Sequence, residues 1–180
     1  MSESDKEMPY IIDKVTGNLA PHIGAEDNRQ KAEELLLGEK GFSAADIFVD
    51  HPVSVEVNGQ DYASALDLLV SVDGKPVMVI KCAAGSLDSR QKEVIAAARV
   101  CIDPIPPIAA STDGSEWLLW DVKSGKQMGR GADSVPDKSR AGDILAAYTP
   151  EPLEGKALMR ERLIFRSYDM DNVNVARKAY

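Results

Sequence analysis

Two residues of opposite charge stand in apolar strands of this sequence, at a spacing that can bring them together. Asp67 interrupts the run ALDLLV (65–70), and Lys81 follows the run VMVI (77–80). A charge in a buried strand needs a partner, because burying it unpaired is costly in free energy. The two side chains could form a structural cross-strand salt bridge or be the remnant of a catalytic centre. The residue types alone leave both interpretations open.

Both residues belong to a predicted β-hairpin whose turn contains Asp73-Gly74. A two-residue loop would place Asp67 opposite Ile80, whereas a three-residue loop with a glycine bulge would place it opposite Lys81. The two charges are neighbours in either register. The second strand, 77–80, is apolar on both faces, so we expect it to be a central strand covered by helices on each side.

The rest of the chain predicts an α/β fold, a mixed β-sheet flanked by helices. We expect a loosely docked arm over 1–25, one domain over 26–148 and a helical extension over 149–180. The expected elements are a helix over 26–40, a strand over 53–57, a helix ending at 100, a strand over 105–110, a hairpin over 116–129 and helices near 140–148 and 153–165. A right-handed crossover makes the 105–110 strand parallel to 77–80.

The composition argues against several classes of protein. Of 180 residues, 21 are Lys or Arg and 29 are Asp or Glu, giving a net charge of −8. An acidic surface disfavours strong indiscriminate binding of nucleic acid, although a local basic face can still bind a polyanion. The two cysteines and two histidines have neither zinc-ligand spacing nor a disulfide framework. The sequence has no apolar run long enough to span a membrane and does not begin with the residue order of a secretion signal, so we expect a cytoplasmic protein.

An ordered series of motifs carries a resemblance to a known family. Glu26 opens the first predicted helix and is followed by Arg29-Gln30, Asp67 lies in a strand, and DGKPVMVI (73–80) forms the next turn and strand. This order resembles the N-terminal nuclease domain of type I restriction enzyme R subunits, which has the PD-(D/E)XK nuclease core. The resemblance extends over about residues 26–145 and implies a restriction-endonuclease-like α/β core.

The resemblance implies a metal site that this sequence only partly matches. In the family, a first-helix Glu, a strand Asp and a Glu-x-Lys on the next strand hold Mg²⁺, and the Lys stabilises charge on the phosphate. Glu26 matches the first acid and Asp67 the second. The pattern Val-Ile-Glu-x-Lys stands here as VIKCA (79–83), so Lys81 replaces the second metal carboxylate and Ala83 replaces the catalytic lysine.

A shifted alignment does not restore this triad. If Lys81 is taken as the catalytic lysine, Val79 stands where the acid belongs. We therefore expect a remnant site of Glu26, Asp67 and Lys81, in which the ammonium of Lys81 occupies the region of the missing ion and pairs with Asp67. Such a site would hold no cofactor.

Three functions remain open at this stage. The first is a stand-alone, catalytically inactive domain that binds DNA or a protein partner in DNA restriction or processing. The second is an active Mg²⁺-dependent DNA endonuclease with a rearranged centre of Glu26, Asp67 and Lys81, in which Asp67 would be a metal ligand. The third is a structural interaction protein with no role at nucleic acid.

A basic patch on the helix that follows Lys81 could serve the first two functions. Arg90, Lys92 and Arg99 could face phosphate near the mouth of the family's active site. The same three residues could equally form a solvated charged face.

Overall fold

The computed structural model describes residues 9–170, which form two β-sheets and four α-helices. A two-stranded sheet of β1 (Tyr10–Ile12) and β2 (Leu19–Pro21) precedes a six-stranded sheet in the order β3-β4-β5-β6-β7-β8. The larger sheet contains β3 (Ile47–Val57), β4 (Gln60–Val72), β5 (Lys75–Cys82), β6 (Ile108–Thr112), β7 (Trp117–Asp121) and β8 (Gln127–Arg130). The helices are α1 (Glu26–Gly38), α2 (Gln91–Cys101), α3 (Lys138–Ala147) and α4 (Gly155–Met170).

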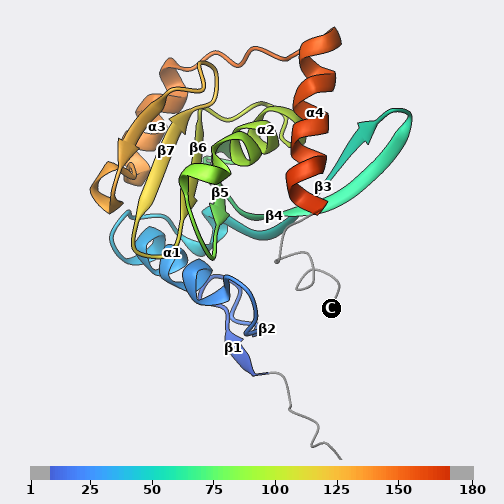
Figure 1. The fold of residues 1–180 in the computed structure, drawn as a ribbon. Coiled ribbons are helices and arrows are strands. Elements are labelled where there is room, and N and C mark those ends of the chain that lie inside the picture. Colours follow the sequence, from blue (N-terminus) through green and yellow to red (C-terminus); the bar gives the residue numbers. More distant parts are fainter. Residues whose placement is uncertain (1–8, 171–180) are drawn as a thin grey trace, which may run out of the picture.

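The six-stranded sheet is mixed, as the sequence predicts. β5 and β6 are parallel and are joined by the crossover that contains α2, whereas the other neighbouring pairs are antiparallel. A long hairpin of β3 and β4 projects beside α4 (Figure 1). The prediction of a mixed β-sheet flanked by helices is confirmed.

Helices cover both faces of this sheet and create two hydrophobic cores. Val79 of β5 packs in the core that also contains Val94 of α2 and Phe165 of α4. Ile80, the next residue of β5, packs in the other core with Leu36 of α1. Successive side chains of a strand point to opposite faces, so β5, with its apolar run 77–80, is the central strand that its sequence predicts.

The structure extends two predicted elements and forms a hairpin within the predicted arm. β3 begins at Ile47 rather than near residue 53, because it pairs with β4 from Ile47↔Val70 onward. Helix α4 continues to Met170, five residues beyond its predicted end. Residues 10–21 form an antiparallel hairpin fixed to α1, in which the Lys14 backbone N–H donates to Oε1 of Gln30 at 3.0 Å. This part of the predicted loose arm is therefore an ordered element, and residues 1–8 lie outside the described chain.

The register of the β4–β5 hairpin combines a tight turn with a bulge. Asp73-Gly74 form a two-residue turn at φ 51° and 76°, the left-handed conformation that such turns require. Beyond the turn, the register shifts by one residue next to Pro76, which has no N–H to donate to a ladder. Leu68 consequently pairs with Ile80, which aligns Asp67 with Lys81. Without the bulge, Asp67 would lie opposite Ile80.

Candidate functional site

Lys81 is the centre of a buried ion cluster formed by β4, β5 and α2. Its Nζ atom lies 3.4 Å from Oδ2 of Asp67 and 3.3 Å from Oε1 of Glu93. The two acids are 2% and 3% exposed, and Lys81 is 8% exposed. The expected ion pair between Asp67 and Lys81 is present, and a second carboxylate from α2 completes the cluster.

The cluster keeps the Lys81 side chain positively charged. Burial lowers the pKa of its ammonium, but the charges of Asp67 and Glu93 outweigh this effect and raise the pKa above the ordinary value. A lysine with a raised pKa neutralises nearby anions and is not a general base near neutral pH.

Each carboxylate of the cluster has a further partner that fixes its orientation. Asp67 Oδ2 accepts a hydrogen bond of 2.9 Å from the backbone N–H of Cys82. Glu93 Oε2 lies 3.2 Å from Nη1 of Arg90, one turn earlier in the chain. Both acids are therefore held by protein donors in addition to Lys81.

The sequence prediction missed Glu93, although the sequence contains a signal for it. Glu93 precedes Ala97 by four residues, so both lie on the same face of α2, the face that packs on the sheet. An acid on the buried face of a helix requires a cationic partner. Lys81 was the available buried cation, but only the crossover geometry shows that α2 lies over it.

Helix α4 closes the space around the cluster. The cavity beside Lys81 has a volume of about 20 Å³, and its walls include Phe165 and Asp169 of α4. This volume is close to that of a single water molecule. The ion cluster is thus covered from the side on which α4 packs against α2 (Figure 1).

These residues do not fit the Mg²⁺ that the resemblance implies. Mg²⁺ needs near-octahedral oxygen ligands at about 2.0–2.1 Å and usually retains several waters. Here an ammonium lies between the two carboxylates, and the remaining space holds about 20 Å³. Within residues 9–170, no group of three or more His, Cys, Asp or Glu side chains has an arrangement that could hold a metal ion.

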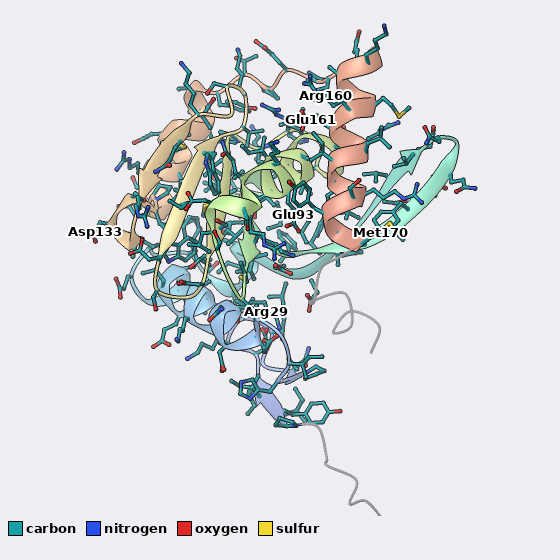
Figure 2. All side chains as sticks on the ribbon, viewed as in Figure 1. Arg29, Glu93, Asp133, Arg160, Glu161 and Met170 are labelled. Carbon is teal, nitrogen blue, oxygen red and sulfur yellow. The ribbon has the colours of Figure 1, made fainter. Side chains whose placement is uncertain are left out.

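Glu26, the third residue of the predicted remnant site, belongs to a different ion cluster. It is fully buried, and its Oε1 lies 2.6 Å from Nη2 of Arg29 and accepts a hydrogen bond of 2.9 Å from Gln30. Arg29 also contacts Asp13 of the β1–β2 hairpin at 3.1 Å. Figure 2 shows Arg29 on α1 and Glu93 on α2. The structure thus joins Asp67 to Lys81 and gives Glu26 a separate role.

The second cluster contains a carboxyl with an unusual pKa. Glu33 is fully buried, with Oε1 3.8 Å from Nε of Arg29. Burial and the negative charge of Asp13 raise the pKa of Glu33 to about 8, despite the opposing charge of Arg29. Asp13 is also buried, but hydrogen bonds from Thr16 and the charge of Arg29 lower its pKa. Near neutral pH, Glu33 is therefore mostly neutral and Asp13 is charged.

The predicted basic patch is divided between internal and exposed side chains. Arg90 pairs with Glu93, and Arg99 pairs with Glu161 of α4 at 3.2 Å. Arg99 also donates to the backbone oxygens of Val122 and Lys123. Lys92 is exposed. Two of the three predicted phosphate contacts are therefore engaged in intramolecular interactions.

A comparison with models of known protein families gave a match for this chain. A model of the family described as type I restriction enzyme R protein N terminus (HSDR_N) matches residues 24–136. Neither the curated proteins nor the solved structures gave a match. Among residues 9–170, no helix is long and apolar enough to cross a membrane.

Replacing Lys81 with methionine should strongly destabilise the domain. The change leaves Asp67 and Glu93 buried without their cation, which costs about 3–5 kcal/mol of unfolding free energy. Urea denaturation at pH 7 measures the loss. The matched change Lys92→Met, at an exposed position of α2, should cost less than about 0.5 kcal/mol. Equal losses for both variants would show that the Lys81 cluster contributes no specific stability.

Glu33 should make stability fall with rising pH. Its pKa is raised on folding, so unfolding releases a proton between the ordinary value of 4.5 and about 8. This contribution is fully present below pH 4.5, decreases by up to about 1.4 kcal/mol per pH unit, and is gone above about pH 8. Glu33→Gln should remove the dependence, and the exposed Glu34→Gln should retain it. Urea denaturation at pH 5, 6, 7 and 8 checks this, and an unchanged slope in Glu33→Gln would contradict it.

Proposed function

The chain belongs to the family of type I restriction enzyme R protein N termini, and we propose that this member acts by binding a partner and has lost metal-dependent DNA cleavage. The family resemblance implies a nuclease core with two metal carboxylates and a catalytic lysine. In this chain, Lys81 and Ala83 occupy the positions of the second carboxylate and the lysine. The fold is retained while the residues for cleavage are changed.

The position of Lys81 carries this proposal. Its ammonium lies between Asp67, the strand acid that the resemblance assigns to the metal, and Glu93 of α2. Exchanging a metal carboxylate for an ammonium changes the local charge by about two units, and each unit at about 4 Å is worth roughly 4 kcal/mol at an effective dielectric constant near 20. This repulsion, together with the small enclosed volume, opposes metal binding.

An active endonuclease is the competing proposal, and Glu93 is the observation in its favour. Glu93 lies within a few ångströms of Asp67 and Lys81. The three side chains are an Asp, a Glu and a Lys, which are the residue types of the family's catalytic centre. Glu26 would be the third acid in the rearranged centre, but it pairs with Arg29 and Gln30. The enclosed cluster favours the inactive domain.

Metal titration and a cleavage assay separate the two proposals. Isothermal titration of the full chain with Mg²⁺ and with Mn²⁺ should detect no micromolar site, and supercoiled plasmid should remain intact with either metal. The reason is that the Lys81 ammonium lies between the carboxylates that would bind the ion. A micromolar site that disappears in Asp67→Ala, with nicking lost in the same variant, would establish the active nuclease instead.

The charges around the site favour a protein partner over DNA. Arg90 and Arg99 have intramolecular acidic partners. A larger cavity of about 780 Å³ shares Ala65 and Asp169 with the small cavity beside Lys81, and its walls also include Asp50 and Arg29. The chain as a whole has a net charge of −8, which repels phosphate, whereas a protein segment can present complementary cations, amides or apolar groups. We therefore propose a protein partner in DNA restriction or processing.

Binding to DNA should be weak and independent of the predicted basic patch. Fluorescence anisotropy with a labelled 20-base-pair duplex at about 150 mM salt should show a dissociation constant no tighter than the 10⁻⁴–10⁻⁶ M range of non-specific binding. Lys92→Gln should leave the dissociation constant unchanged, because we expect no phosphate contact through this exposed lysine. A submicromolar constant that weakens in Lys92→Gln, with a salt slope reduced by about one, would identify DNA as the partner.

A further inference from the structure

Helix α4 lies in a groove formed by α2 and the β3–β4 hairpin. It packs against both elements, and Figure 1 shows it standing between them. The helix comprises Gly155–Met170, whereas the family match ends at residue 136. The groove is thus built by the family core, and the helix that fills it comes from outside the matched region.

The buried face of α4 carries a regular stripe of three residues. Glu161, Phe165 and Asp169 follow one another at intervals of four and are 5%, 2% and 3% exposed. Residues spaced by four lie above one another on the same face of a helix. The groove therefore contacts α4 through an acid, an aromatic ring and a second acid.

The two acids bind opposite walls of the groove. Oε1 of Glu161 lies 3.2 Å from Nη1 of Arg99 on α2, and Figure 2 shows Glu161 on the part of α4 near that helix. Oδ2 of Asp169 accepts a hydrogen bond of 2.7 Å from the hydroxyl of Tyr62 on β4. These contacts fix both the position of the helix along the groove and its rotation about its axis.

Phe165 supplies the apolar anchor between the acids. Its ring lies edge-on to that of Tyr62, with 6.3 Å between ring centroids. It belongs to the core that contains Val94 and Ala97 of α2, and it borders the small cavity beside Lys81. A buried aromatic side chain is a frequent anchor of a helix in a groove.

The remainder of α4 is held less extensively. On its outer side, Leu163 is 41% and Met170 is 60% exposed. Residues 148–154, which connect it to α3, form no helix or strand and include Pro150 and Pro152. The helix is thus attached to the core mainly through one face and joined to it by an irregular, proline-containing connection.

We propose that this groove is a helix-binding site, which α4 fills as an internal ligand and from which a partner helix with the same stripe can displace it. The partner is a protein helix with an acid, an aromatic residue and a second acid at positions i, i+4 and i+8. The inference rests on the proposed binding role and adds the chemistry of the partner. Displacement would uncover Arg99 and Tyr62 for the incoming acids.

A labelled peptide of residues 153–170 tests the proposal against the full chain. Phe165→Ala in the chain weakens its own α4 and leaves the groove intact, so this variant should bind the peptide about tenfold or more tightly than the unaltered chain does. A peptide that itself carries Phe165→Ala should bind neither chain. The control chain Leu163→Ala changes the exposed side of α4 and should behave like the unaltered chain. Fluorescence anisotropy gives the affinities, and circular dichroism verifies folding of each variant.

Several results would overturn the proposal. One is a folded Phe165→Ala chain that binds the peptide no better than the unaltered chain. Another is a Phe165→Ala peptide that binds as tightly as the unaltered peptide. The third is a stable dimer, detected by light scattering, in which two copies exchange α4. Plasmid nicking by the full chain would instead refute the proposed loss of cleavage, whatever the peptide result. The two failures are therefore distinguishable.

Amide hydrogen exchange on the unaltered chain gives an independent test that needs no folded variant. If α4 leaves the groove while the core stays folded, its amides should exchange faster than those of β5. Excess peptide should accelerate exchange in α4 alone. If the amides of α4 exchange no faster than those of β5, and added peptide does not change their rate, the helix is a permanent part of the core.

Discussion

The fold is organised around an ammonium group enclosed between two carboxylates. Lys81 extends from the central strand β5, Asp67 from the neighbouring strand β4, and Glu93 from the crossover helix α2. A buried charge without partners would be unfavourable by several kcal/mol, so each of these elements must keep its place for the others to remain buried. The cluster therefore fixes the register of β4 against β5 and the position of α2 together.

The backbone supports this arrangement at one point of the sheet. Pro76 cannot donate a ladder hydrogen bond, and the adjacent register shift moves the pairing of β4 and β5 by one residue. That single step aligns Asp67 with Lys81, so both side chains point to the face covered by α2 and α4. On the opposite face, Glu26 and Arg29 form the second ion cluster, which attaches the β1–β2 hairpin to α1. In both clusters, buried acids hold neighbouring elements together.

Most of the core elements could be predicted from the sequence, whereas the complete site could not. Alternating and wholly apolar runs identify the strands, and Asp73-Gly74 identifies the hairpin, because these are local properties. The pair of Asp67 and Lys81 follows from that hairpin. Glu93 was missed because its partner lies on another element, and Glu26 was expected beside Lys81 but pairs with Arg29 on its own helix. Non-local contacts depend on how helices pack, which periodicity does not specify.

The sequence by itself determined the α/β class and the family resemblance. It did so because strand patterns, turns and motifs are written in neighbouring residues. Only the tertiary structure decided that Lys81 has two acidic partners, that the cavity beside Lys81 is only about 20 Å³, and that Phe165 of α4 forms part of its wall. These facts depend on distances between segments that are far apart in the chain, and such distances exist only after the helices have packed onto both faces of the sheet.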